Sequence, residues 1–231
     1  WPVRYKDIEP WYEKVEKFIG VSGEALGLPQ LPDSKFCPPM ELNCVEKDLR
    51  ENMAKNYDDG RVLTMGRIAH ITGTEAFEGR SACQFRNRCM RGCPFGGYFS
   101  SNSSTLPAAE RTGNLTIRPF SVVTQVIYDE TTGKASGVEI IDAETKEKMV
   151  FNSKVVFLCA SAIASASILL QSKSERFPNG LGNDSGEVGH NIMDHHFKAG
   201  AYATVNDFED KYYKGRRPGG SGPGMWLRRG H

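Results

Sequence analysis

The stretch SVVTQVIYDETTGKASGVEIIDAETKEKMVFN, residues 121–152, decides the local fold of this chain. It holds runs of strand-forming residues at positions 121–129, 137–142 and 148–152. Short polar turns separate the runs, and the first of these turns carries Gly133. Apolar runs joined by short polar turns are typical of antiparallel strands that neighbour each other in a sheet. The stretch therefore predicts a three-stranded antiparallel β-meander.

After the meander comes an apolar run, residues 154–159, and then a series of small residues at positions 160–166. We expect the run to be a short strand buried on both faces, and the small residues to lead into a helix over residues 167–172. Small side chains at such a junction let a ligand approach the unpaired N–H groups at the helix start. Ordinary tight packing of a strand against a helix explains the same residues equally well.

Before the meander, residues 80–100 (RSACQFRNRCMRGCPFGGYFS) show neither helical nor strand periodicity and predict an ordered loop. Three thiols and four cations lie in it: Cys83, Cys89, Cys93, Arg80, Arg86, Arg88 and Arg91. Structural zinc usually takes four ligands, often from Cys-x-x-Cys pairs, and the loop has neither such a pair nor a histidine. Three thiolates in cationic surroundings suit a small iron–sulfur cluster better. Packed thiols, a disulfide or contact with an anionic cofactor would also order the loop.

Helices are expected at the start of the chain. Asp7 is a good N-cap for a helix whose apolar residues recur at helical spacing up to Ile19 and which ends at Gly20. Pro10 is placed in the first turn, where its missing N–H is harmless. Further helices are predicted at residues 45–57 and 105–111, and further strands at residues 61–71, 115–118 and 199–205. The expected fold class is α+β, a mixed α/β arrangement.

Composition excludes some classes of function. The 231 residues include 29 Lys and Arg and 28 Asp and Glu, and this balance argues against nucleic acid as the main partner. The longest apolar run, residues 155–170, is interrupted by serine and cysteine, so no integral membrane segment is expected. We expect a soluble protein, in either a bacterial cytoplasm or periplasm. The N-terminus has no signal-peptide pattern and no starting Met, which suggests a piece of a longer protein.

Near residue 195, Asp194, His195 and His196 stand together and could form a metal or acid/base site. The alternative, which we favour, is that these side chains fix a turn by hydrogen bonds.

Several segments together resemble the glucose–methanol–choline (GMC) family of flavin oxidoreductases. Residues 1–12 resemble WP-x-x-Y-x-D-x-x-P-x-Y, residues 92–100 resemble GC-x-x-G-x-x-x-S, and residues 186–195 resemble G-x-V-G-x-N-x-x-D-H. The matching segments follow the family's order and lie at residues 1–23, 89–100, 105–117, 155–172 and 186–196. The resemblance covers roughly residues 1–205.

The resemblance implies an FAD enzyme that oxidises an alcohol group of a sugar, a polyol or choline. Residues 1–78 would be cap or substrate-side helices, residues 79–197 part of the FAD-binding domain, and residues 198–231 the start of a substrate-domain sheet with a flexible tail. By position, Val122 and Val123 match the strand at the adenine end of FAD. Ala160, Ser161 and Ala162 match the turn near the FAD phosphates, although Ser161 stands where the family usually has Gly.

The family's pyrophosphate-binding motif, G-x-G-x-x-G, does not occur in these residues. Its C-terminal catalytic His is not matched either, and His195 and His196 belong to a different motif. No catalytic residue is therefore assigned, and the chain is interpreted as an internal fragment that alone neither holds FAD tightly nor turns over substrate.

Some sugar dehydrogenases of the family pass electrons to a cytochrome and carry a three-iron cluster at similarly spaced cysteines. Cys83, Cys89 and Cys93 match this spacing approximately. The enzyme could be a dehydrogenase or an oxidase, and this match favours a dehydrogenase with a cytochrome or another electron acceptor as its partner. The alternative function, from another class, is a non-catalytic iron–sulfur or metal-binding module for electron transfer.

Overall fold

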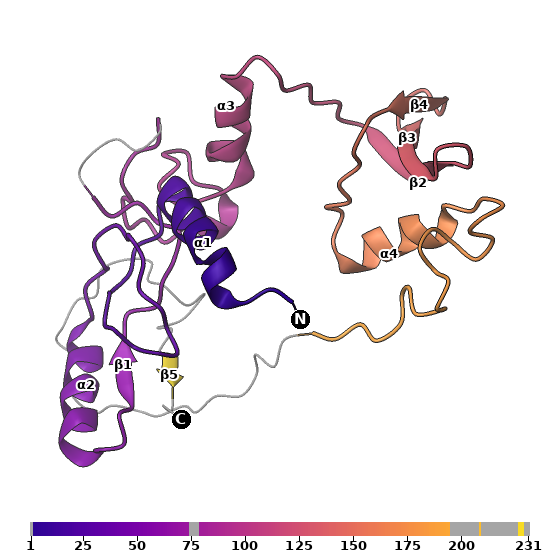
Figure 1. The fold of residues 1–231 in the computed structure, drawn as a ribbon. Helices are drawn as coiled ribbons and strands as arrows, with labels where there is room; N and C mark the ends of the chain where they lie inside the picture. The colour runs from indigo at the N-terminus through magenta and orange to yellow at the C-terminus, as the bar shows by residue number, and fades with distance from the viewer. Residues whose placement is uncertain (1, 74–78, 195–207, 209–225, 229–231) are drawn as a thin grey trace. The chain divides into compact units, whose positions relative to one another are not determined.

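The computed structural model describes residues 2–73, 79–194, 208 and 226–228 and divides the chain into two compact units (Figure 1). Unit 1 comprises Trp1–Leu115 together with Tyr202–His231, and unit 2 comprises Thr116–Ala201. The division after Leu115 falls inside the segment 79–197 that the sequence assigns to one domain. That assignment to cap, FAD and substrate domains remains a prediction.

Unit 2 is built on the meander. Its strands are β2 (Ser121–Asp129), β3 (Lys134–Asp142) and β4 (Lys148–Asn152), and they form an antiparallel sheet in the order β2-β3-β4. Val126 pairs with Val138, and Glu139 pairs with Val150. At the β2–β3 turn the Asp129 carboxylate accepts the N–H of Thr131 at 2.8 Å, as short polar turns commonly do. The three-stranded meander predicted from residues 121–152 is confirmed.

Helix α4 (Ala162–Gln171) packs against β2 and closes the small core of unit 2, as Figure 1 shows. Ile168 of the helix is buried, as are Val126 of β2 and Ile140 of β3. The hydroxyl of Ser172, at the end of the helix, is also buried and hydrogen-bonded to β2. The helix predicted at residues 167–172 is confirmed but is longer than predicted, because it begins at Ala162, within the series of small residues.

Two predicted strands are wrong. Residues 115–118 and 154–159 have no regular structure, and among the described residues no strand pairs with either segment. A strand needs a hydrogen-bonded neighbour for its backbone groups, so apolar composition alone does not make one. The segment expected to be buried on both faces is instead largely exposed, with 63% of Val155 and 83% of Phe157 accessible.

Unit 1 begins with α1 (Tyr5–Ile19), which starts earlier than predicted. Asp7 is therefore not the N-cap but the third helical residue, and its carboxylate accepts the backbone N–H of Arg4 at 2.8 Å. Pro10 consequently lies in the second turn. Gly20 ends the helix with a φ of 73°, a left-handed conformation that glycine adopts easily. No residue of α1 is buried, and its apolar side includes Trp11 at 63% exposure.

Helix α2 (Cys44–Asn56) confirms the second predicted helix and has a reciprocal cap. The Asn43 side chain accepts the N–H of Glu46, and the Glu46 carboxylate accepts the N–H of Asn43. Such paired bonds satisfy N–H groups that a helix start otherwise leaves unpaired. Shorter helices follow along unit 1: η1 (Cys89–Arg91), η2 (Ser101–Ser103) and α3 (Thr105–Glu110).

The predicted strand over residues 61–71 is much shorter in the structure. Only β1 (Val62–Thr64) is regular, and it pairs antiparallel with β5 (Trp226–Arg228). Beyond it, isolated bridges join Ile68 to Ser22 and His70 to Tyr98. The core of unit 1 is formed by buried apolar side chains, most of which lie outside regular strands: Val21, Met40, Met53, Leu63, Met65 and Ile71. The strand predicted at residues 199–205 lies outside the described residues.

Candidate functional site

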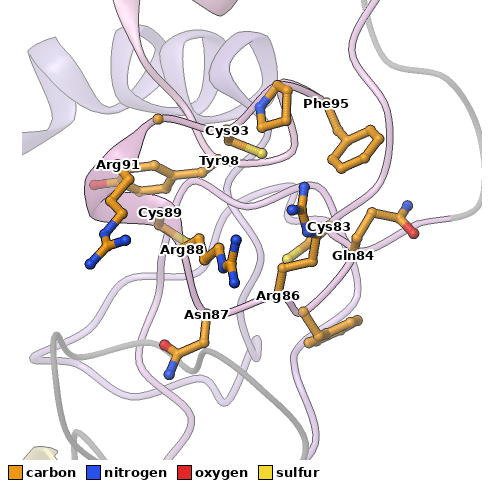
Figure 2. A pocket seen from close by; sticks show the side chains of 13 residues that line it. Cys83, Gln84, Arg86, Asn87, Arg88, Cys89, Arg91, Cys93, Phe95 and Tyr98 are labelled. Atoms are coloured by element: carbon orange, nitrogen blue, oxygen red, sulfur yellow. The ribbon is translucent and has the colours of Figure 1, made fainter.

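The predicted cysteine loop surrounds a cavity of about 230 Å³ in unit 1. Cys83, Cys89 and Cys93 all line this cavity, and Figure 2 shows their side chains around it. The loop from residue 83 to residue 98 supplies every lining residue. The structure thus brings together the three thiols that the sequence singled out. We call this cavity the thiol pocket.

A buried arginine anchors the loop. The Arg80 side chain is 2% exposed, and its Nε donates to the carbonyl of Gly96 while Nη1 donates to the carbonyl of Ile19, both at 2.8 Å. Burial lowers the pKa of Arg80, although the nearby Cys37 and Cys93 thiols act in the opposite direction. The bond to Ile19 ties the loop to the end of α1.

The two ends of the loop, at Cys83 and Gly97, lie close together because Gly97 has no side chain. A Cβ at this position would lie 2.9 Å from the Cα of Cys83, so only glycine fits without a shift of the backbone. The Ile71 N–H donates to the Gly97 carbonyl at 2.9 Å, and the Cys83 N–H donates to the Ile71 carbonyl at 2.7 Å. These bonds fix the base of the thiol pocket.

Cys93 lies in a cradle of backbone N–H groups. Burial would raise the pKa of its thiol, but hydrogen bonds from the N–H groups of residues 95–98 outweigh burial and lower that pKa. Oriented backbone N–H groups of this kind stabilise negative charge. A lowered pKa favours the thiolate, which is the form in which cysteine acts as a ligand or a nucleophile.

His70 is a site residue that sequence reasoning missed. It is fully buried, its Nε2 lies 3.6 Å from the Cys89 sulfur, and its ring lies 4.8 Å from that of Tyr98. It comes 19 residues before Cys89, inside a segment predicted as a strand, so no motif spacing pointed to it. The fold alone brings this imidazole beneath the thiol pocket.

The metal prediction finds no supporting geometry. Among the residues that the structure describes, no group of three His, Cys, Asp or Glu side chains is arranged to hold a metal ion. The three thiols therefore line one cavity, but their sulfur atoms are not arranged around a single metal position. A cluster at Cys83, Cys89 and Cys93 stays a prediction from the sequence.

The second predicted site is the turn before α4 in unit 2. Ser161 has a φ of 75° and a ψ of 166°, a backbone conformation that is found almost only in glycine. The sequence placed Ser161 where the resembled family usually has Gly, and the backbone indeed has the glycine-type form. Ala160, Ser161 and Ala162 are all exposed. The Ser161 hydroxyl caps the helix by accepting the N–H of Ala164 at 3.4 Å.

The helix start after Ser161 leaves backbone N–H groups available. The Ser165 N–H donates to the Ser161 carbonyl at 2.9 Å, which is the first bond of the helix. In the described structure no acceptor is found for the N–H groups of Ala162 and Ile163, which come before it. Exposed N–H groups at a helix N-terminus, surrounded by small side chains, are suited to a phosphate group.

Val122 and Val123 occupy successive positions of β2, so their side chains point to opposite faces of the sheet. Val122 is 56% exposed, whereas Val123 is half-buried. Only one of the two can therefore face a ligand on a given side. Their predicted role beside FAD remains a prediction.

Of the acidic and histidine group near the end of unit 2, only Asp194 is described; His195 and His196 lie outside the described residues. Among the helices of the described residues, none combines the length and the apolar character needed to cross a bilayer.

Comparison with known proteins gives a family model, described as GMC oxidoreductase, that matches residues 2–197. The chain is 27% identical to a 2-methyl-1,2-propanediol dehydrogenase of Mycolicibacterium austroafricanum over 93% of the chain and 38% of the relative. It is 24% identical to the fructose dehydrogenase large subunit of Gluconobacter japonicus over 83% of the chain and 34% of the relative. A 6'''-hydroxyparomomycin C oxidase of Streptomyces lividus is 25% identical over 96% of the chain and 43% of the relative. The chain thus spans between 34% and 43% of the length of these relatives.

Proposed function

The chain belongs to the GMC oxidoreductase family, and from this premise we propose that it forms part of an FAD-dependent oxidoreductase that oxidises an alcohol group. A sugar or polyol is the proposed substrate class. The names of two relatives, a propanediol dehydrogenase and a fructose dehydrogenase, support this class, since both molecules carry CH–OH groups. The proposal concerns the whole protein, of which these residues supply one part.

The observation that carries the proposal is the backbone at Ser161. A glycine-type conformation held by a serine costs on the order of 1–3 kcal/mol, and such strain is concentrated at ligand-binding turns. Here the turn is exposed, the N–H groups of Ala162 and Ile163 are available, and no side chain at residues 160–162 is larger than serine. An exposed turn with small side chains and available N–H groups is suited to an FAD phosphate.

The residues of the chain would act on FAD by binding and orienting it. The N–H groups at the start of α4 would donate to phosphate oxygens, and the positive end of the helix dipole would favour the negative charge. When bound, the flavin supplies the redox chemistry by accepting a hydride from the alcohol carbon. The group that removes the hydroxyl proton is not assigned to any residue of this chain.

The test is FAD retention by the purified protein that contains these residues, with Ser161→Asp as the variant. Aspartate is as good an N-cap as serine, and it carries the same backbone cost as serine in the glycine-type conformation, so we expect the turn to be kept. Its carboxylate would repel the phosphates, so we expect the flavin absorbance per protein to fall at least tenfold after gel filtration. Ser185→Asp, which adds the same charge to an exposed loop, is the control.

Equal flavin retention in the Ser161→Asp variant and the control would contradict the assignment of the turn. A parent protein that binds no flavin at all would contradict the proposed function itself. Whether the protein is a dehydrogenase or an oxidase, and whether a cytochrome accepts its electrons, would follow from the acceptor that reoxidises it. A three-iron cluster at Cys83, Cys89 and Cys93, or a non-catalytic electron-transfer role, would require about three irons per chain.

A further inference from the structure

The residues proposed to hold FAD lie on two different elements of unit 2. Ala160, Ser161 and Ala162 form the turn at the start of α4, whereas Val122 and Val123 lie on β2. A long cofactor that contacts both elements gains from the second contact only if the two elements are held at the matching separation. A residue that connects α4 to β2 therefore bears on cofactor binding even if it does not touch the cofactor.

Ser172 makes this connection at the opposite end of α4. Its hydroxyl accepts the N–H of Val126 in β2 at 2.8 Å and donates to the Ile168 carbonyl in α4 at 2.6 Å. A serine hydroxyl offers one donor and two acceptor sites, so a single group can serve both elements at once. Ser172 is only 3% exposed, so a ligand on the surface of unit 2 does not reach its side chain.

The bond adds direction to the packing between α4 and β2. Ile168 and Val126 are buried apolar side chains, and their burial holds the helix on the sheet without a preferred direction. A hydrogen bond to a backbone N–H has a narrow range of distance and angle, so it defines the position of the helix along β2 more sharply. The ten residues of α4 extend about 15 Å, so a shift or tilt at Ser172 is carried to the N–H groups of Ala162 and Ile163.

The loop after α4 supports the same end of the helix in a different way. The Leu181 N–H donates to the Leu169 carbonyl at 2.9 Å, which holds the loop on the helix. The Phe177 ring lies edge-on to the ring of Tyr128, with the ring centroids 5.0 Å apart, at the end of β2 that leads into the turn. Ser172 differs from these contacts because it joins the helix and the strand backbone directly.

We propose that Ser172 is a positioning residue for FAD, which sets the separation between the Ser161 turn and the part of β2 proposed to lie beside the adenine. The inference rests on the proposed function and adds to it a residue that acts through the elements it joins. Loss of the bond should weaken a ligand that spans both elements, because a misfit lowers the effective concentration of the second contact. A ligand that contacts only one element should be nearly unaffected. A residue that only stabilises unit 2 would make no such distinction.

The test is isothermal titration of the full protein, after removal of its flavin, with FAD, FMN and adenosine as the three probes. FAD spans both elements, FMN carries a phosphate without the adenine, and adenosine carries the adenine without a phosphate. We expect Ser172→Ala to weaken FAD binding at least about tenfold, and to weaken FMN and adenosine binding by less than about twofold. Ser172→Thr keeps the hydroxyl and should recover most of the affinity for FAD.

Ile168→Val is the matched control, because it weakens the same buried contact but keeps the hydrogen bond, and it should bind all three probes as the wild type does. Thermal unfolding checks that every variant is folded at the temperature of the titration. Equal weakening of the three probes in Ser172→Ala, an equal loss of FAD in Ile168→Val, or unchanged FAD affinity in Ser172→Ala would overturn the inference. If the wild type binds FAD, these results contradict the inference alone. A wild type that binds neither FAD nor FMN would contradict the proposed function as well.

Discussion

The hydroxyl of Ser172 accepts a hydrogen bond of 2.8 Å from the backbone N–H of Val126, and so joins the end of α4 to β2. Both residues are buried, and the same hydroxyl donates to the Ile168 carbonyl at 2.6 Å. In the described sheet β2 is an edge strand, so this serine satisfies an N–H that no neighbouring strand reaches.

Replacing Ser172 by alanine should destabilise unit 2 by about 1–3 kcal/mol, because the buried N–H of Val126 loses its acceptor. Hydrogen exchange followed by NMR should show faster exchange at Val126 and along β2. Ser185→Ala, at an exposed position, should leave these rates unchanged. Unaltered exchange at Val126 in the Ser172→Ala variant would show that the bond does not hold α4 against the sheet.

Gly137 of β3 should not tolerate a side chain. A Cβ there would lie 2.2 Å from the carbonyl oxygen of Phe151 in β4, so the two strands would have to separate. We expect Gly137→Ala to cost about 1–3 kcal/mol and to increase exchange along β4. Gly73→Ala, where an added Cβ meets nothing within 4 Å, is the matched control and should change stability by less than about 0.5 kcal/mol.

Acid should weaken unit 2 through Asp142. Its carboxylate accepts the N–H of Thr145, pairs with Arg118 and accepts the N–H of Glu144, and these contacts lower its pKa from 3.8 to about 2. A pKa that is lower in the folded state contributes stability above the unfolded value and loses it as pH falls through the folded value. The stability contributed by Asp142 should therefore disappear between about pH 4 and pH 2.

The measurement is the urea midpoint of unfolding of unit 2 at pH 6, 4, 3 and 2. Asp142→Asn should be less stable at pH 6 and should lose less stability on acidification than the wild type. The same change at the exposed Asp58 of unit 1 serves as the control. A wild-type pH profile in Asp142→Asn would show that this carboxylate does not contribute.

The strained backbone at Ser161 makes a comparison of two small substitutions informative. Glycine at position 161 would remove the steric cost of a φ of 75°, but it would also remove the hydroxyl that caps the helix. Alanine would remove the same cap and would keep the steric cost. We expect Ser161→Gly to be more stable than Ser161→Ala by about 1–2 kcal/mol. Denaturant titration compares the two, and the reverse order would mean that the turn relaxes out of its glycine-type form.

Arg80 should not be replaceable by lysine. A lysine has no planar pair of donors for the carbonyls of Gly96 and Ile19, and its ammonium would be buried with an incomplete set of acceptors. We expect Arg80→Lys to lower the free energy of unfolding by about 2–3 kcal/mol. Hydrogen exchange at the Ile71 amide, which donates to the Gly97 carbonyl of the loop, should become faster. Exposed Arg4→Lys is the control, and equal exchange in both variants would exclude the anchoring role.

The elements that could be predicted from the sequence are those whose hydrogen-bond partners are local. The meander was found because each turn, such as the one at Gly133, joins strands that are neighbours in sequence. Helices α1 and α2 satisfy their own backbone, and Gly20 marks the end of α1 clearly. The predicted start of α1 is later than the observed one. Asp7 lies in the first turn and accepts the N–H of Arg4, and an acidic residue is as favourable in the first turn as at the N-cap.

The failures share a physical cause. Residues 154–159 have the composition of a buried strand, but a strand depends on a neighbour that the segment's own residues do not specify. The candidate site shows the same limit: spacing indicated Cys83, Cys89 and Cys93, yet His70 reaches Cys89 only through the tertiary path of the chain. The glycine-type form of Ser161 could be suspected only from the family resemblance, because serine itself gives no signal for a positive φ.

The bond from Arg80 to Ile19 also bears on how this region could be transplanted. An engineer who grafts residues 80–100 onto another scaffold would carry the guanidinium but leave behind the carbonyl at the end of α1 that receives it. The graft would then hold a buried cation with half of its acceptors missing. The smallest exchangeable cassette is therefore discontinuous: the cysteine loop together with the last turn of α1, two pieces that lie about sixty residues apart in sequence.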